Sequence, residues 1–298
     1  MGNNLVKNMQ LGIGTAQFGM NYGVANKDGI VIDSEINNIL TLAKKNNINL
    51  LDTARLYGFS EEAIGSTKIS QNFKIITKTN NFKSFNSQQS KKQLIEDFEI
   101  SLKLLNVKKI YGLLFHNADD LLTDKSSDLW QLLLNLKENN LVEKIGISIY
   151  NSYQIDEILK KFKIDIIQVP INIYDQRLIN SGHIKKMQNL NIEIHARSIF
   201  LQGLLTLECE DLNNFFSPIL NQHKKYWNFL KSNKLSPIKI CLDFIKENNI
   251  NYAIVGVNNS SQLLQIIDNY NQEKLNIDYS LFNIEDENFI NPANWKLK

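Results

Sequence analysis

Leu50-Leu51-Asp52-Thr53-Ala54-Arg55-Leu56-Tyr57-Gly58 is the stretch that decides the fold, because a short apolar run ends there in polar side chains. An Asp that directly follows two leucines, themselves preceded by an amphipathic helical pattern, predicts the carboxyl end of a buried strand. Tyr57 then lies in the loop beyond it. Taken alone, Asp52 and Tyr57 are more simply interpreted as a turn cap and a half-buried loop aromatic. Two later strand ends favour a functional role.

Short runs rich in Ile, Val and Leu recur along the chain, separated by segments with apolar residues at i, i+3, i+4 and i+7. The runs are apolar at nearly every position, which is typical of parallel strands covered by helices. Eight such strand-helix units in 298 residues predict a closed (β/α)8 barrel, the α/β fold also called a TIM barrel. The expected strands are residues 11–16, 49–54, 74–79, 110–116, 144–150, 164–172, 192–200 and 252–257.

A doubly wound sheet is the competing architecture, and it predicts a Gly-x-Gly-x-x-Gly turn that opens a helix after the first strand. Gly12, Gly14 and Gly19 have a different spacing, and no helix is expected to begin there. We therefore expect one barrel domain over residues 1–298. The long segment 205–233 should form a loop and a helix that pack against the barrel. The tail, residues 285–298, is either a terminal helix or a lid over the barrel mouth, and the terminal helix is favoured.

The composition argues against several classes of protein. Charge is nearly balanced, with 33 basic and 31 acidic residues, and the scattered lysine pairs are typical of solvated helix faces, not of a nucleic-acid groove. Cys209 and Cys241 suggest neither a disulfide framework nor a zinc site. No signal-peptide core and no apolar window of about 20 residues is present. We expect a cytoplasmic monomer or weak homo-oligomer that acts on small molecules, without nucleic-acid or membrane partners.

Polar side chains follow three consecutive expected strands. Asp52 and Tyr57 follow the second strand, Lys78 ends the third and His116 ends the fourth. Because the carboxyl ends of barrel strands form the active-site face, these four side chains can converge on one pocket. Singly, Lys78 could emerge into water at the rim, and His116 could be a hydrogen-bonded core histidine. Jointly they indicate acid-base chemistry.

A Lys ammonium beside a Tyr hydroxyl stabilises the phenolate and lowers a pKa that is ordinarily about 10. Asp52 within ion-pair distance would hold Lys78 charged and aimed. Tyr57 would then be a usable proton donor near neutral pH, and His116 would orient a carbonyl oxygen toward it.

A metal-dependent hydrolase would need several His and Asp residues at strand ends. Only one of the four histidines stands at an expected catalytic strand end, so no metal site is predicted; the four are His116, His183, His195 and His223.

These motifs resemble those of the aldo-keto reductases. The similarity rests on Leu11-Gly12-Ile13-Gly14-Thr15, the block of residues 51–61, Thr77-Lys78 and His116, and it extends over essentially the whole chain. It implies a barrel reductase in which Tyr57 is the general acid, Asp52 and Lys78 tune it, and His116 positions the carbonyl. The implied cofactor is NADP(H), with NAD(H) as the alternative.

The resemblance also implies that Ser148 and Gln168 hold the nicotinamide carboxamide. Ile149 stands where the family has an Asn, so Tyr150 or Asn151 would have to supply the missing partner.

Two further strand ends are implied to bind the cofactor. Arg197 replaces an aromatic residue that stacks on the nicotinamide ring, and its guanidinium would either stack there or face a substrate anion. The turn after the eighth strand would bind the adenosine phosphate and ribose, beside a helix N-terminus, but it contains no Lys or Arg. The residues expected to contact the cofactor are Thr15, Ser148, Gln168, Arg197, Ser198, Phe200, Gly256, Asn258 and Gln262.

Two functions of different class remain open. The leading one is an NAD(P)H-dependent oxidoreductase that reduces an aldehyde or ketone to an alcohol, or runs the reverse reaction. The alternative is a cofactor-binding regulatory or accessory subunit with little turnover, and the complete set of four residues favours the enzyme. Short loops after strands one and four, and polar residues expected at the mouth, suggest a polar carbonyl such as a sugar derivative. The mouth residues are Asn117, Tyr174, Arg177 and Arg197.

Overall fold

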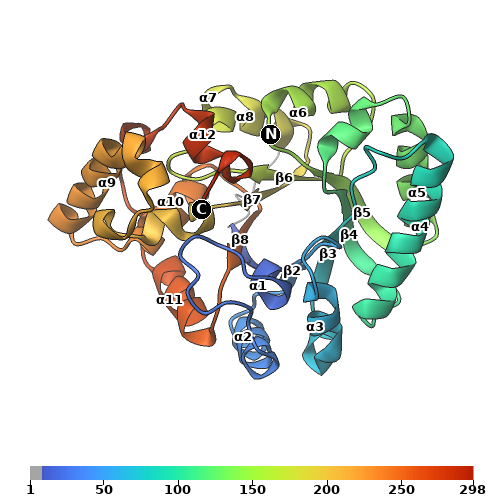
Figure 1. The fold of residues 1–298 in the computed structure, drawn as a ribbon, viewed down its shortest axis with the longest axis horizontal. Helices are drawn as coiled ribbons and strands as arrows, with labels where there is room; N and C mark the ends of the chain where they lie inside the picture. Colours follow the sequence, from blue (N-terminus) through green and yellow to red (C-terminus); the bar gives the residue numbers. More distant parts are fainter. Residues whose placement is uncertain (1–8, 298) are drawn as a thin grey trace, which may run out of the picture.

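Eight parallel strands close into a barrel in chain order, each paired with the next and β8 paired with β1, in a computed structural model that describes residues 9–297. Figure 1 shows the strands as an inner ring with the helices outside it. The predicted single-domain (β/α)8 barrel is confirmed. The strands are β1 (Gln10–Gly14), β2 (Leu50–Asp52), β3 (Lys74–Lys78), β4 (Ile110–Phe115), β5 (Val142–Ser148), β6 (Ile166–Pro170), β7 (Glu193–Arg197) and β8 (Tyr252–Gly256).

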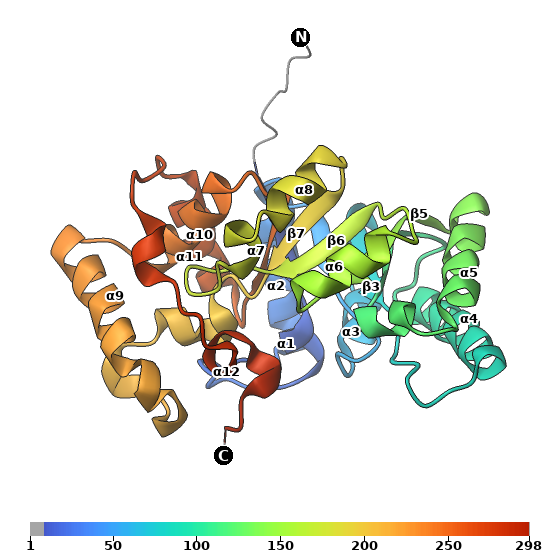
Figure 2. The ribbon, with the colours of Figure 1, turned by 90° about the horizontal axis from the view of Figure 1, so that it is seen from above.

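The helices cover the outer face of the sheet, and their apolar stripes form one large core with the outward side chains of the strands. Figures 1 and 2 show α4 and α5 beside the first half of the barrel, α10 and α11 beside the last strands, and α9 outside α10. The helices are α1 (Ala16–Gly19), α2 (Asp33–Lys45), α3 (Ser60–Ser66), α4 (Ser87–Leu104), α5 (Ser126–Glu138), α6 (Ser152–Leu159), α7 (Arg177–Asn180), α8 (His183–Asn189), α9 (Leu220–Asn233), α10 (Pro237–Glu247), α11 (Ser260–Asn271) and α12 (Glu287–Ile290).

Helix starts follow local chemistry. Ser236 caps α10 by accepting a hydrogen bond of 3.1 Å from the Ile238 N–H, and Pro237 occupies the first helical position. Asn151 caps α6 in a reciprocal arrangement with Gln154. The sequence-based expectation that no helix begins after the first strand is wrong, because α1 forms a single turn directly after Thr15.

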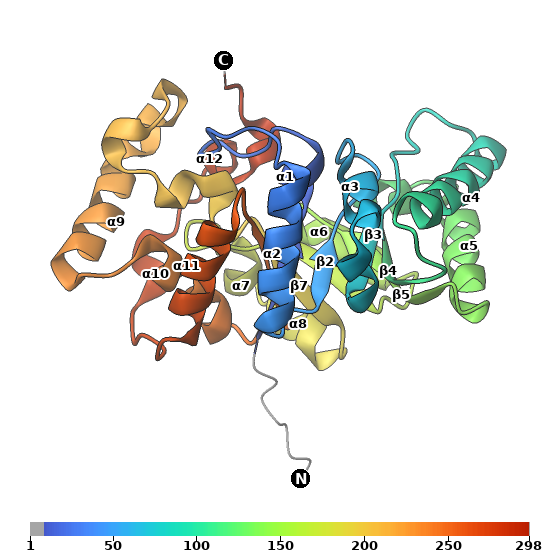
Figure 3. The same cartoon turned by 90° about the horizontal axis from the view of Figure 1, so that it is seen from below.

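The long segment of residues 205–233 and the C-terminal tail both pack against the barrel. Residues 205–233 contain short 3₁₀ turns followed by α9, and Phe216 and Tyr226 are buried there. In the tail, the Trp295 ring lies 4.9 Å from the Phe216 ring, centroid to centroid. Figures 2 and 3 show α12 at the same end of the barrel as α1. The tail is a docked terminal segment, and none of its described residues lines the main cavity discussed below.

A close contact between α3 and the end of α4 yields a stability prediction. A Cβ at Gly65 would lie 1.9 Å from the Leu104 carbonyl oxygen, so Gly65→Ala must push backbone apart. We expect a loss of about 1–3 kcal/mol in the free energy of unfolding, measured by urea denaturation. Ser66→Ala, at the adjacent exposed position, should change it by less than about 0.5 kcal/mol. Equal stability of the two variants would contradict the close contact.

Candidate active site

A buried ion pair forms the floor of the site. Lys78 Nζ lies 2.8 and 2.9 Å from the two carboxylate oxygens of Asp52, and it also donates to the Thr53 carbonyl at 2.9 Å. Gln168 Nε2 donates to Asp52 Oδ1 at 2.8 Å. Asp52 is opposite Ile76 in the β2–β3 ladder, and Lys78 follows two residues later on the same face, so the pair is a product of strand register.

Tyr57 and His116 lie beside this pair. The Lys78 ammonium is 5.0 Å from the centre of the Tyr57 ring, and the Tyr57 and His116 rings meet edge to face with centroids 5.6 Å apart. The four side chains predicted to be catalytic are therefore close together at the carboxyl ends of β2, β3 and β4. This is the arrangement expected from their positions at consecutive strand ends.

The Tyr57 loop is held by backbone contact and by buried hydroxyls. Gly58 has a positive φ of 56°, and a Cβ at Gly19 would lie 2.0 Å from the Tyr57 carbonyl oxygen. The Ser60 hydroxyl donates to Thr15, and the Thr15 hydroxyl donates to the Asp52 carbonyl at 3.0 Å. Thr15, which was expected to contact the cofactor, lines the main cavity, but its hydroxyl is engaged in positioning this loop.

Glu61 holds the same loop from the other side. One of its oxygens accepts from the Thr77 hydroxyl at 2.6 Å, and the other accepts from Arg55 at 2.6 Å. The block of residues 51–61, on which the family resemblance partly rests, thus contains contacts that fix the position of Tyr57.

The expected lowering of the Tyr57 pKa is wrong for this arrangement. Burial, first, and the Asp52 carboxylate raise the pKa of Tyr57 above its usual 10.0, while Arg197 opposes that change. The Lys78 ammonium gives its hydrogen bonds to Asp52 and to the Thr53 carbonyl. Burial also lowers the pKa of Lys78, while Asp52 opposes that change. Burial and the charges of Lys78 and Arg197 lower the pKa of His116 to about 3, so the imidazole is neutral at physiological pH.

A cavity of about 700 Å³ opens above these side chains and extends toward β7 and β8. Its volume is within the range of sites for cofactors and drug-sized ligands. Asp52, Tyr57 and His116 line it, and so do all nine residues expected to bind the cofactor, which are Thr15, Ser148, Gln168, Arg197, Ser198, Phe200, Gly256, Asn258 and Gln262.

Ser148 and Gln168 are direct neighbours in the β5–β6 ladder. Gln168 Oε1 is buried and has no hydrogen-bond partner among residues 9–297, so it is free to accept from a ligand amide. Of the two candidates for replacing the Asn expected at Ile149, Tyr150 lines the cavity, whereas the Asn151 side chain is engaged in capping α6.

The loop after β7 carries an unusual backbone. Ser198, Leu201 and Gln202 all have positive φ, between 48° and 57°, although none is glycine. Such conformations store strain and are concentrated at functional sites. Arg197, at the start of this loop, stacks its guanidinium on the Tyr150 ring at 4.3 Å and donates to the Ile149 carbonyl at 2.9 Å.

The turn after β8 is partly occupied by the chain's own groups. Gln262 Oε1 accepts from the Asn258 N–H at 2.8 Å, and Asn259 caps the start of α11. The Glu35 carboxylate accepts a hydrogen bond from the Ser260 N–H. An acidic side chain therefore lies at the helix N-terminus where an adenosine phosphate was expected.

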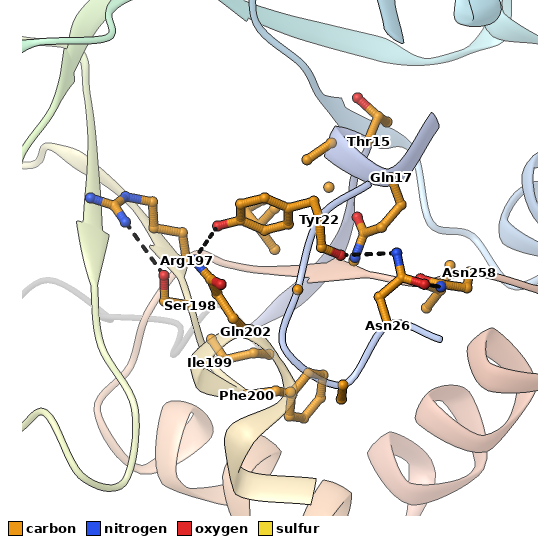
Figure 4. A pocket seen from close by; sticks show the side chains of 18 of the residues that line it. Thr15, Gln17, Tyr22, Asn26, Arg197, Ser198, Ile199, Phe200, Gln202 and Asn258 are labelled. Carbon is orange, nitrogen blue, oxygen red and sulfur yellow. Dashed lines mark hydrogen bonds between the residues drawn. The ribbon is translucent and has the colours of Figure 1, made fainter. Parts of the chain in front are cut away.

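The loop after β1 was missed at the sequence level. It runs from Thr15 to Ile32, before α2, whereas a short loop had been expected. Its Val24 N–H donates to the Gln202 carbonyl at 3.0 Å, its Tyr22 hydroxyl accepts from Gln202 at 3.3 Å, and Asn26 accepts from Asn258. Figure 4 shows the Tyr22–Gln202 and Asn26–Asn258 contacts. The loop covers part of the cavity. Its run of Gln, Asn, Tyr and Gly residues is the sequence feature that could have indicated a long loop.

Three of the four residues expected at the mouth lie elsewhere. Tyr174 is fully buried and its hydroxyl shares a hydrogen bond of 2.9 Å with His223. Arg177 pairs with Asp175 and Glu287 beside a separate small pocket. Asn117 caps a 3₁₀ turn after β4. Arg197 alone of the four lines the main cavity.

The family assignment follows from comparison with known proteins. Residues 10–280 match the sequence model of the Aldo/keto reductase family. The chain belongs to this family of oxidoreductases. Among curated proteins, none matches this aldo-keto reductase.

Solved structures share its fold at low sequence identity. An aldo-keto reductase from Bacillus halodurans in its holo form superimposes with a TM-score of 0.70 at 20% identity, over 90% of this chain and 88% of that one. A glycerol dehydrogenase from Gluconobacter oxydans gives 0.68 at 19% identity, covering 91% and 92% of the two chains. A Bombyx mori aldo-keto reductase in complex with NADP gives 0.66 at 19% identity, covering 94% and 92%.

Two other structural features bear on function. Within residues 9–297, no helix has the length and apolar character needed to cross a membrane. The same part of the chain contains no group of three or more His, Cys, Asp or Glu side chains placed to hold a metal ion.

The His116 environment predicts its titration. With a folded-state pKa of about 3 against an ordinary value of 6.5, the folded protein takes up no proton at His116 between pH 8 and 5, whereas the unfolded chain does. Acidification through that window should therefore destabilise the fold through this group. The test is the His116 ring signal in NMR, identified with a His116→Gln variant. A titration midpoint above pH 5 would contradict the prediction.

Proposed function

We propose that this aldo-keto reductase reduces an aldehyde or ketone to an alcohol with NAD(P)H, and that Tyr57 donates the proton. The observation that carries the proposal is the placement of Tyr57 and His116 on the wall of a large cavity, directly beside the Asp52–Lys78 pair. Both side chains can reach one ligand oxygen there, which is the first requirement for acid catalysis.

The residues present fit a nicotinamide cofactor. Gln168 Oε1 lacks a partner within the described chain, and Ser148 is its neighbour, so together they can hold a carboxamide. The loops after β7 and β8 would hold the remainder through Ser198, Phe200, Gly256 and Asn258. When bound, the cofactor supplies a hydride to the carbonyl carbon. The complex of the Bombyx mori relative with NADP supports NADP(H), and NAD(H) is the alternative.

The proton comes from the Tyr57 hydroxyl. Its raised pKa keeps it protonated over the whole physiological range. An alkoxide, formed as the carbonyl is reduced, is a stronger base than a phenolate, so proton transfer from Tyr57 to it is downhill. The Arg197 cation, which acts to lower the pKa of Tyr57, limits the cost of the resulting tyrosinate. The neutral His116 imidazole carries one N–H, which can hold the carbonyl oxygen in position.

The cavity favours a polar carbonyl, such as a sugar derivative, because hydroxyl and cationic groups surround the reaction point. Tyr22, Tyr150 and Arg197 line the cavity with Tyr57 and His116. The glycerol dehydrogenase among the solved relatives is named for a polyol substrate, which agrees with this class. The same groups would serve the reverse oxidation.

Removal of one hydroxyl tests the role of Tyr57. Tyr57→Phe should lower kcat by about 10²–10⁴-fold, which is the usual contribution of general acid catalysis, while cofactor affinity changes little. Tyr22→Phe is the matched control, because it removes a hydroxyl from the same cavity without removing the proposed acid, and its loss should be below about tenfold. The measurement is steady-state reduction of an aldehyde, with cofactor affinity from fluorescence titration.

Near wild-type turnover in Tyr57→Phe would remove Tyr57 from the mechanism and leave His116 as the acid. Cofactor binding without turnover of any carbonyl would instead support an accessory subunit.

The cofactor preference is expected to be weak. Residues 256–262 contain no Lys or Arg, and the Glu35 carboxylate is bonded to the Ser260 N–H. A basic partner for the 2′-phosphate would be worth about 1.5–3 kcal/mol, so without one NADH should bind less than about a hundredfold more weakly than NADPH. Glu35→Gln should strengthen NADPH binding by about three- to tenfold and leave NADH binding nearly unchanged, since only NADPH places a phosphate near this charge.

Asp33→Asn is the control, because it removes an exposed carboxylate from the same first turn of α2. Equal effects of Glu35→Gln on the two cofactors would show that Glu35 does not face the 2′ position.

A further inference from the structure

Arg197 is a cation within the cavity that has no carboxylate partner among residues 9–297. Its hydrogen bonds go to neutral oxygens, at 2.9 Å to the Ile149 carbonyl and at 3.4 Å to the Ser198 hydroxyl. Its Nε is buried and has no partner within the described residues. A partly buried guanidinium with unused N–H groups gains from an anion.

The charge balance around the reaction point is positive. Asp52 is neutralised by Lys78 at 2.8 Å, and His116 is neutral, so Arg197 adds an uncompensated positive charge. Its charge reaches the catalytic residues, since it contributes to lowering the pKa of His116 and of Lys78. Of the two acidic residues on the cavity wall, Asp52 is the paired one, and Asp28 lies on the exposed loop after β1.

The geometry of Arg197 is suited to a planar or tetrahedral anion. The guanidinium is fixed by its stack on Tyr150, with 4.3 Å between Arg197 Cζ and the ring centre. In Figure 4 the Arg197 side chain lies on the opposite side of the labelled set from Asn258, which belongs to the turn expected to bind adenosine. Arg197 therefore lies away from the end of the cavity expected to bind adenosine, and its charge reaches His116 and Tyr57.

We propose that Arg197 is the anion-binding residue of the substrate site, and that the physiological substrate is a carbonyl compound bearing a carboxylate or phosphate group. This inference rests on the proposed carbonyl reductase function and specifies its substrate class. Arg presents a rigid fork of donors that matches either anion, and Lys would not replace it fully.

Ligand binding tests the anion site without turnover. Benzoate, phenyl phosphate and benzamide are titrated into the protein by calorimetry, with and without NADPH. We expect benzoate or phenyl phosphate to bind at least tenfold more tightly than benzamide. The tighter ligand of the two shows whether the site prefers a carboxylate or a phosphate. Arg197→Gln should weaken binding of that anion by about 10–100-fold, the range for a charged hydrogen bond. Arg197→Lys should retain part of the affinity.

Lys27→Gln is the matched control, because it removes another positive charge that lines the same cavity but lies on the loop after β1. Lys27→Gln should weaken binding of the anion by less than about threefold, since exposed charges are screened.

Turnover gives a second readout. The ratio of kcat/KM for 4-carboxybenzaldehyde to that for methyl 4-formylbenzoate compares two aldehydes that differ in one charge. When benzoate is the tighter anion, Arg197→Gln should lower this ratio by about 10–100-fold. When phenyl phosphate is tighter, glyceraldehyde 3-phosphate and glyceraldehyde form the corresponding pair.

The proposal is overturned when both anions bind no better than benzamide, or when Arg197→Gln and Lys27→Gln have equal effects. It is also overturned when Arg197→Gln weakens NADPH binding and leaves the substrate ratio unchanged, because Arg197 then serves the cofactor. Absence of turnover with every aldehyde would refute the proposed function, while calorimetry would still decide the anion site.

Discussion

The Asp52–Lys78 ion pair is the interaction on which the rest of the site depends. Both charges are removed from water inside the barrel, and such a pair is tolerated only when further hydrogen bonds satisfy it. Gln168 and the Thr53 carbonyl supply those bonds, from β6 and from the end of β2. Below this polar layer lies an apolar layer that includes Leu50 and Ile76. The boundary between the two layers defines the floor of the cavity.

The fold and the clustering of Asp52, Lys78 and His116 were predictable from the sequence for one physical reason. Parallel strands buried on both faces are continuously apolar, so the residue that ends each run is visible, and barrel closure brings these ends together. Asp52, Lys78 and His116 could be located in this way. The apolar run also predicted β8 well, since its expected and observed limits, 252–257 and Tyr252–Gly256, differ by one residue.

Properties that depend on the exact direction of a side chain were not predictable. The direction of the Tyr57 pKa shift depends on how deeply the side chain is buried and on how near it lies to Asp52, and no spacing rule encodes either. Tyr174 was expected at the mouth because it follows β6, yet it turns inward to His223. The loop after β1 was underestimated because its closure depends on contacts with Gln202 and Asn258, which are distant in sequence.

The cover formed by the loop after β1 has a kinetic consequence. It is joined to the loop after β7 through Val24 and Tyr22, and to the turn after β8 through Asn26. Where a long ligand lies beneath these contacts, they must separate before it can enter or leave. The rate at which the loop opens then sets an upper limit on the rate of ligand exchange, whatever the equilibrium affinity of the ligand. Tight binding under such a cover is expressed mainly as a long residence time, so successive turnovers can be paced by release instead of chemistry.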